Sequence, residues 1–376
     1  MTTALIEPYL KVMAQTGASD LFFVTGAPAC IKVDSRVQPL SEVALKPGEV
    51  AKIAAEIMSP DQLASLETQR SANFGISRPQ VGRYRVNVYY QRGQVAMVIR
   101  HVRLTVPTMK DLGLPAVLKQ FVMQRNGLVI VVGSTGSGKS TTLAAMVDHR
   151  SRNEMGHILT VEDPIEFMFP HRLSIVGQRE VGLDTPSYEL ALQDGMREAP
   201  DVIMVGEVRS RETMRHVLNY ADTGHLVLTT LHATSANQAL DRLIHMFPED
   251  FRGEILSDLS INLRAIVAQR LVVMPQGKRT AAVEILVNTP FVSELIRHDR
   301  VSELKEAMQQ GAKDGMQTFD QALFRLYKEG KIELEEALSK ADSRADLEWS
   351  LNFGGGVTNT EDTVDEDFRL PGEAAR

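Results

Sequence analysis

The pattern of apolar and polar residues changes character near residue 105. Residues 5–15 place apolar side chains at helical spacing, whereas residues 83–90 alternate between apolar and polar positions. Such alternation is typical of a strand with one buried and one solvated face. Together with the neighbouring stretches 72–77 and 95–102, it predicts an antiparallel sheet. We interpret residues 1–102 as a small α+β domain.

Beyond that point the apolar stretches become continuous, and helical stretches lie between several of them. A strand without polar interruptions is typical of a parallel sheet that is covered on both faces. The later chain therefore predicts an α/β domain over residues 116–290. The four stretches are GLVIVVG (127–133), HILTVED (157–163), DVIMVGE (201–207) and HLVLTTLH (225–232).

The remaining segments differ in composition. Residues 103–115 are interpreted as a linker, and residues 291–350 have a helical pattern. The last stretch, 351–376, is rich in glycine and then acidic, with six acidic and two basic residues. Few apolar side chains and an excess of one charge predict disorder for this acidic tail.

Composition narrows the classes of function. The formal net charge of the 376 residues is −7, which argues against a general nucleic-acid binder because such binding needs a basic surface. The single cysteine, Cys30, can form neither an internal disulfide nor a cysteine-cluster metal site. No apolar run approaches the about 20 residues that span a bilayer, and no signal peptide is recognisable. We expect a protein of a reducing compartment such as the cytoplasm.

The segment GSTGSGKST matches the phosphate-loop pattern G-x-x-x-x-G-K-[ST], and it lies between an apolar strand and a predicted helix. Glycines let the backbone curl so that its N–H groups point at phosphate oxygens. Lys139 is expected to reach the β- and γ-phosphates, and Ser140 to ligate Mg²⁺. The nine residues are Gly133, Ser134, Thr135, Gly136, Ser137, Gly138, Lys139, Ser140 and Thr141.

Acidic residues follow two of the other apolar strands. Glu162, Asp163 and Glu166 come after one strand, and Glu207 comes after another with Gly206 before it. Ligands of open parallel sheets bind beyond the carboxyl ends of the strands, where these acids could activate a water or hold a metal. The alternative is a solvated acidic turn and a surface acid at the start of a loop.

Two histidines flank the last of these strands. His225 and His232 are seven residues apart, so they are expected on opposite faces, and only one can face a nucleotide. We favour His232, at the carboxyl end, as a donor that senses the γ-phosphate. The alternative is a histidine with a structural role alone.

The four blocks, taken in order, resemble the Walker A, Asp box, Walker B and His box of the bacterial type II/IV secretion and type IV pilus ATPases. The resemblance extends over about residues 1–350 and implies a PAS-like N-terminal domain followed by a RecA-like ATPase domain with C-terminal helices. GMQTFDQAL (315–323) is similar to the C-terminal helices of the family's retraction branch. The main retraction motors carry a signature close to AIRNLI, where this chain has FVSELI (291–296). The segments VGQREVGLDT, APDVIM, IVAQRLV and FDQALFRLYKEGKIELEEALSKADS look more like the accessory retraction ATPases.

The resemblance implies a mechanism and a set of residues. ATP and Mg²⁺ are the expected ligands, with Glu162 as the water-activating base and Glu207 on the metal side, although these two roles could be exchanged. Ser140, Glu207 and Asp163 are expected to hold Mg²⁺, partly through water. Arg85 and Arg100 of the N-terminal domain are expected to reach phosphate, unless they are solvated strand residues. Weaker candidates for a contact between subunits are Arg197 and Arg209.

The same resemblance implies partners and a location. We expect a ring-shaped homo-hexamer that works with a PilT-type retraction ATPase and a PilC-type platform protein, at the inner-membrane base of the pilus. No zinc is expected, because the four-cysteine module of the extension branch is missing, and no nucleic acid. Two alternatives stay open at this point: a scaffold that binds ATP and acts only through a partner ATPase, and a RecA-like motor that translocates DNA.

Overall fold

The computed structural model describes residues 5–353, apart from 34–35, 79–81 and 103–104. The predicted acidic tail therefore lies outside the described residues from 354 onward, and its first three residues end a helix instead. The described chain forms two compact units. Most of the first is Met1–Thr105, joined by two short later segments, and the second contains nearly all of the remaining residues.

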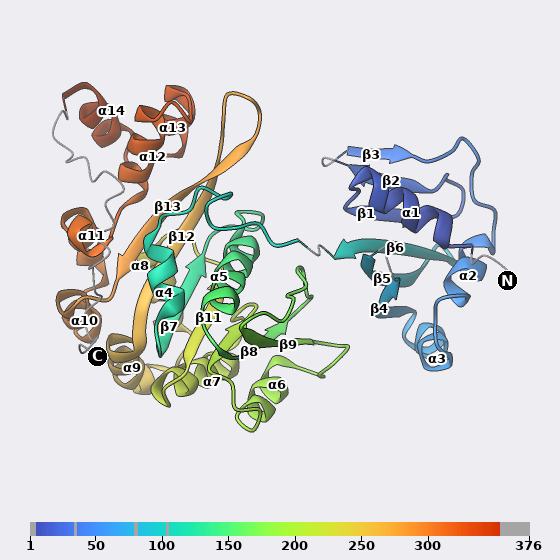
Figure 1. Cartoon of the computed structure of the whole chain (residues 1–376), viewed down its shortest axis with the longest axis horizontal. Coiled ribbons are helices and arrows are strands. Elements are labelled where there is room, and N and C mark those ends of the chain that lie inside the picture. Colours follow the sequence, from blue (N-terminus) through green and yellow to red (C-terminus); the bar gives the residue numbers. More distant parts are fainter. Residues whose placement is uncertain (1–4, 34–35, 79–81, 103–104, 354–376) are drawn as a thin grey trace. The chain divides into compact units, whose positions relative to one another are not determined.

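The N-terminal unit is built on a six-stranded antiparallel sheet with the strand order β3-β2-β1-β6-β5-β4 (Figure 1). Its predicted alternation is confirmed, because Tyr84, Val86 and Val88 on β5 are fully buried. The strands are β1 (Asp20–Phe23), β2 (Cys30–Val33), β3 (Arg36–Pro39), β4 (Ser71–Arg78), β5 (Gly82–Gln91) and β6 (Gln94–Val102).

Three helices complete this unit: α1 (Glu7–Thr16), α2 (Glu49–Ala55) and α3 (Pro60–Gln69). The helix α1 buries Leu10, whose carbonyl accepts a hydrogen bond of 3.2 Å from the hydroxyl of Tyr84. That bond ties helix to sheet while it satisfies a buried phenol. The helix α3 begins with a capping box in which Ser59 and Gln62 bond each other's backbone N–H groups.

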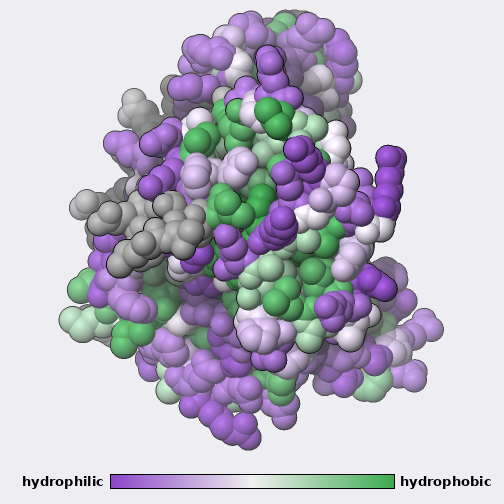
Figure 2. Space-filling view, turned by 90° about the vertical axis from the view of Figure 1, so that its right-hand side faces the viewer, coloured by the Kyte–Doolittle hydropathy of each residue, from purple (hydrophilic) through white to green (hydrophobic). Residues whose placement is uncertain are grey.

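The surface carries apolar side chains among polar ones. In the face that Figure 2 presents, green apolar side chains gather in the middle, and purple polar side chains surround them. Exposed apolar residues of the N-terminal unit include Leu5, Val37 and Val43.

Among the described residues, no helix combines the length and apolar character needed to cross a membrane.

The second unit is built on a seven-stranded sheet with the strand order β13-β12-β7-β11-β10-β8-β9 (Figure 1). Neighbouring strands run parallel except at the β12–β13 pair. Every residue of β7, β10 and β11 is buried, which requires cover on both faces. The strands are β7 (Gly127–Val132), β8 (Gly156–Glu162), β9 (Ser174–Glu180), β10 (Val202–Val205), β11 (Leu226–Leu231), β12 (Leu263–Val273) and β13 (Arg279–Val287).

Helices that alternate with these strands provide the cover. Three of them begin with a serine side chain that accepts a hydrogen bond from the first helical turn, at Ser187, Ser210 and Ser235. The helices are α4 (Val117–Met123), α5 (Lys139–Asn153), α6 (Tyr188–Gly195), α7 (Arg211–Asp222), α8 (Ala236–His245) and α9 (Arg252–Asn262), with a 3₁₀ turn η1 (Glu249–Phe251).

The C-terminal helices contact this sheet through Arg270 of β12, the strand next to the edge strand β13. Its guanidinium lies 3.8 Å from the ring centre of Phe319, 2.7 Å from an Asp342 carboxylate oxygen and 2.9 Å from the Lys340 carbonyl. The elements are α10 (Pro290–Arg297), η2 (Val301–Glu303), α11 (Leu304–Gln310), η3 (Ala312–Asp314), α12 (Phe319–Lys328), α13 (Leu334–Lys340) and α14 (Arg344–Phe353). The predicted fold class is confirmed: an α+β domain, a parallel-sheet domain and C-terminal helices.

One buried acid stands out in the β13 strand. Glu284 is 1% exposed, and its Oε1 accepts a hydrogen bond of 2.8 Å from the backbone N–H of Ala236, the first residue of α8. Burial raises the pKa of Glu284 to about 7, although the bond from Ala236 favours the charged form. Because the pKa of Glu284 is higher in the folded state than in the unfolded state, its protonation stabilises the folded protein at low pH. This contribution is lost as the pH rises through about 7.

We therefore expect Glu284→Gln to gain stability relative to the unchanged protein as the pH is raised from 5 to 8. A pKa shift of this size corresponds to a relative gain of up to about 3 kcal/mol. Thermal unfolding across this pH range measures it. Glu335→Gln, an exposed acid of α13, is the matched control and should show no such trend. A constant difference between Glu284→Gln and the unchanged protein at all pH values would contradict the assignment.

Candidate functional site

The phosphate loop joins the end of β7 to the start of α5. Gly133 and Gly138 have φ angles of 157° and 92°, and Gly138 caps the helix. A Cβ atom at Gly133 would lie 2.3 Å from the hydroxyl oxygen of Ser137 and 2.6 Å from the carbonyl of Gln269. Glycine is therefore required there by space as well as by backbone conformation. The loop therefore lies between a strand and a helix, as its sequence motif predicts.

Lys139 curls back over this loop. Its Nζ donates hydrogen bonds to the carbonyls of Gly133 at 2.8 Å and Ser134 at 3.1 Å, and the residue is only 9% exposed. Near it, the hydroxyl of Ser137 is buried and has no hydrogen-bond partner among the described residues. A cation held against the loop, an unsatisfied hydroxyl and the N-terminus of a helix together suit an anionic phosphate group.

Glu162 ends the β8 strand and is 7% exposed. Its Oε1 accepts hydrogen bonds from the Thr160 hydroxyl at 2.9 Å and from the side-chain amide of Gln178 at 3.2 Å. These donors come from β8 itself and from the neighbouring β9. The carboxylate is therefore oriented by the sheet, and it is not an acid on a freely solvated turn.

Glu207 lies in a second group of charges just beyond β10. Its Oε2 accepts a hydrogen bond of 2.7 Å from Nε of Arg209, and its Oε1 lies 3.0 Å from Nε2 of His232. Arg209 also reaches Asp163, with 3.4 Å between Nη1 and Oδ2. The structure thus brings Asp163 and Glu207 together through Arg209, and His232 joins them through its contact with Glu207. We refer to Glu162, Asp163 and Glu207 as the acid cluster.

Arg209 has a role within its own chain. We expect it from the sequence as a weaker candidate for a contact between subunits, and in the structure it bridges two carboxylates of its own chain. In the sequence, the sign of this contact is that Arg209 stands only two residues after Glu207. Arg197, the companion candidate, is largely exposed and lies 4.0 Å from Asp194.

Close packing around position 206 explains why a glycine precedes Glu207. A Cβ atom at this position would lie 3.1 Å from the hydroxyl oxygen of Tyr188, 3.3 Å from the Cα of Glu162 and 3.3 Å from the carbonyl of Val161. Each of these distances is tighter than an ordinary carbon contact. The absent side chain therefore lets β8, β10 and the start of α6 meet closely at the acid cluster.

These residues also fit a magnesium ion. Mg²⁺ takes oxygen ligands, keeps several waters and is usually held by one or two carboxylates together with substrate phosphates. Ser140 on the first turn of α5 and the carboxylates of Glu207 and Asp163 supply that type of donor. Among the described residues, no group of three or more histidines, cysteines or acids forms a metal site by itself.

The two N-terminal arginines belong to the other compact unit. Arg85 on β5 and Arg100 on β6 are directly paired across the two strands, and Arg85 is half-buried. Arg100 is exposed, and its Nε donates a hydrogen bond of 2.8 Å to Asp20. A contact of either residue with phosphate stays a prediction.

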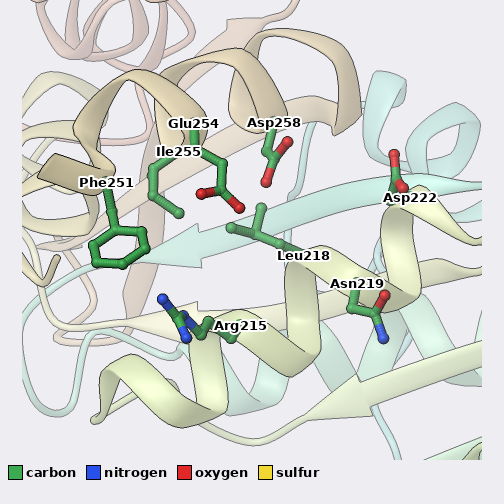
Figure 3. Close-up of a pocket in the computed structure, with 8 residues that line it drawn as sticks. All are labelled: Arg215, Leu218, Asn219, Asp222, Phe251, Glu254, Ile255 and Asp258. Atoms are coloured by element: carbon green, nitrogen blue, oxygen red, sulfur yellow. The ribbon is translucent and has the colours of Figure 1, made fainter.

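A separate groove of about 530 Å³ lies between α7 and α9 (Figure 3). Its lining includes Asp222, Glu254 and Asp258, and the guanidinium of Arg215 lies over the ring of Phe251. Burial, together with the neighbouring acids, raises the pKa of Asp258. None of the four sequence blocks contributes to this groove, so it is distinct from the acid cluster.

Comparison with known proteins gives a consistent set of relatives. The family model described as type II/IV secretion system protein matches residues 2–320. The chain is 50% identical to the type IV pilus ATPase PilU of Pseudomonas aeruginosa over 93% of this chain and 91% of that protein. It is 41% identical to the retraction ATPase PilT of the same organism, over 89% and 98%.

A solved structure agrees with these relatives. The crystal structure of the pilus retraction motor PilT with bound ADP matches with a TM-score of 0.86 and 39% identity. That match covers 92% of this chain and 99% of the PilT chain.

The packing around Gly206 predicts the effect of one added methyl group. Gly206→Ala should displace Tyr188 or Glu162 and lower the rate of ATP hydrolysis on the order of 10–100-fold, because small misplacements of catalytic groups are costly. A colorimetric phosphate assay measures the rate. Gly253→Ala is the control, because its Cβ atom would meet nothing within 4 Å, and it should leave the rate unchanged. Full activity in Gly206→Ala would show that this contact is unimportant.

Proposed function

Since the chain belongs to the type II/IV secretion system protein family, we propose that it hydrolyses ATP with the help of Mg²⁺ to drive or assist the retraction of type IV pili. The protein is an ATPase of the same type as PilU and PilT, and it binds nucleotide. One observation carries the proposal: the phosphate loop, His232, Glu207 and Glu162 lie at the carboxyl ends of four adjacent parallel strands, β7, β11, β10 and β8.

The substrate ATP would place its phosphates on the backbone N–H groups of the loop, with Lys139 neutralising their charge. Glu162 would accept a proton from the attacking water, because it is the buried carboxylate that fixed donors orient. His232 would report the state of the γ-phosphate through its contact with Glu207. The products are ADP and inorganic phosphate.

A bound Mg²⁺ would offset the negative charge of the phosphate oxygens. Ser140, Glu207 and Asp163 would hold it, some of them through water. In this chain Arg209 already neutralises Asp163 and Glu207, so the arginine would have to yield part of that contact when the metal arrives. Arg85 and Arg100 would supply charge to the transition state from the N-terminal domain, a contribution that can reach ~10³–10⁵ in rate.

We further propose a homo-hexameric ring that works beside a PilT-type ATPase and pulls on a PilC-type platform protein at the inner-membrane base of the pilus. The 50% identity to PilU, against 41% to PilT, favours the accessory role. In such a ring, closure of the two domains over ATP and their release after hydrolysis would provide the stroke.

Two substitutions separate the roles of the acids. Glu162→Gln should lower the hydrolysis rate about 10²–10⁴-fold and leave ATP bound, because the base is lost and the phosphate loop is intact. Glu207→Gln should also lower the rate, and in addition it should raise the Mg²⁺ concentration that half-saturates the enzyme. Turnover assays and retention of labelled ATP measure the two effects. Normal hydrolysis by both variants would refute the assignment, and reversed Mg²⁺ responses would exchange the roles.

The cellular role can be tested in strains that carry only this protein, only its PilT-type partner, or both. We expect retraction to be strongest with both and to fall when Lys139→Ala replaces the unchanged chain, since the loop then lacks its cation. Fluorescently labelled pili measure the retraction rate. Full retraction with Lys139→Ala would instead indicate a scaffold, and DNA-stimulated hydrolysis would indicate a DNA motor.

A further inference from the structure

We propose that Gln269 is a positioning residue for nucleotide binding, and that it holds both ends of the phosphate loop in the shape that receives phosphate. The inference rests on the proposed function, because it concerns the site at which that function places ATP. Gln269 lies on β12, outside the four sequence blocks, and it is 4% exposed.

The pairing of the strands places Gln269 beside the loop. The strand β12 runs parallel to β7, and its Ala268 pairs with Val132, the last residue of β7. Beyond that pair β12 continues to Val273, whereas β7 is followed by the loop, which starts at Gly133. Gln269 is therefore the first residue of β12 whose neighbour on that side is the phosphate loop.

Both ends of the loop lie against Gln269. At the start of the loop, a Cβ atom on Gly133 would be 2.6 Å from the backbone carbonyl oxygen of Gln269. At the end of the loop, a Cβ atom on Gly138 would be 2.9 Å from the side-chain amide nitrogen of Gln269. Ordinary contacts between non-bonded heavy atoms are about 3.5–4.0 Å long, so the two glycines approach this residue more closely than any other amino acid could.

The side chain of Gln269 also bonds the helix that follows the loop. Its Oε1 accepts a hydrogen bond of 2.7 Å from the hydroxyl of Thr142, which is 1% exposed. The backbone N–H of Thr142 donates to the carbonyl of Gly138 at 2.9 Å, so this threonine belongs to the first turn of α5, which also carries Lys139. Because both partners are buried, water cannot easily replace the bond.

A glycine-rich loop needs such a support. Glycine loses more backbone freedom on ordering than any other residue, and residues 133–138 include three glycines. A loop that is already ordered binds its ligand more tightly, because the entropy of ordering does not oppose binding. The middle glycine, Gly136, would meet nothing within 4 Å if it carried a Cβ atom. The loop is thus held at its ends and open in its middle, where phosphate can approach.

Gln269→Met tests the proposal in the full-length protein, because it keeps the length of the side chain and removes the amide. We expect the Kd for ADP and the KM for ATP to rise about 10-fold, since a buried hydroxyl is left unsatisfied and the loop loses its support. The kcat at saturating ATP should stay within about twofold, because the contact serves binding and not the chemical step. Isothermal titration calorimetry with ADP and steady-state phosphate release measure these constants.

Substitutions at Thr142 test the same bond from the other partner. Thr142→Val removes the hydroxyl and should weaken ADP binding by a similar factor. Thr142→Ser keeps the hydroxyl and should bind ADP within about twofold of the unchanged protein. Combining Thr142→Val with Gln269→Met should weaken binding little further, because two groups that act through one contact are not additive.

Thr229→Val is the matched control. Thr229 is a threonine of β11 that is 1% exposed, and its hydroxyl donates a hydrogen bond of 2.8 Å to the carbonyl of Val205 on β10. The substitution therefore removes a buried hydroxyl from the same sheet, at a bond between two other strands. We expect it to lower the melting temperature and to leave the affinity for ADP unchanged, as a role in folding alone would do.

The outcomes separate this inference from the proposed function. Unchanged ADP affinity in both Gln269→Met and Thr142→Val would overturn the inference alone, because the loop would then keep its shape without this contact. A lower kcat with unchanged ADP affinity would also overturn it, since Gln269 would then act in the chemical step. If the unchanged protein bound no ADP, the proposed function and the inference would fail together.

Discussion

The candidate site depends on the parallel register of four strands. Val132 of β7 pairs with Leu231 of β11, Thr229 of β11 with Val205 of β10, and Val205 with Val161 of β8. Each strand therefore ends within a residue or two of its neighbour, and whatever follows it in sequence arrives at one edge of the sheet. Segments that are tens of residues apart in the sequence form one site because the parallel pairing of the four strands places their ends side by side.

This constraint also explains how far the sequence could predict the structure. Continuous apolar runs identified β7, β8, β10 and β11, and the residue after each run could be assigned to the shared edge. The strands β9, β12 and β13 were not identified. Polar side chains interrupt the first two, such as Gln178 on β9 and Gln269 on β12, and Glu284 interrupts the third. These strands belong to the sheet because of the strands that they pair with, and their own sequences lack a continuous apolar pattern.

The contacts inside the site were predictable only in part. The phosphate loop and the positions of Glu162 and Glu207 follow from local motifs, because strand, turn and helix lie in one stretch of chain. The bridge from Arg209 to Asp163 joins residues 46 positions apart, and the contact between Thr142 and Gln269 joins residues 127 apart. Single-sequence patterns carry no information about such pairs. Tyr188 was missed for the same reason, since nothing in its own segment indicates that its hydroxyl meets Gly206.

The strand β12 joins the phosphate-loop helix to the C-terminal helices. Gln269 accepts a hydrogen bond of 2.7 Å from Thr142 on the phosphate-loop helix, whereas its neighbour Arg270 holds Phe319 and Asp342 of the C-terminal helices. Successive residues of a strand point to opposite faces, so one peptide link separates the two attachments. The phosphate-loop helix and the C-terminal helices are therefore attached to neighbouring residues of one largely buried strand, about 3.3 Å apart along its axis.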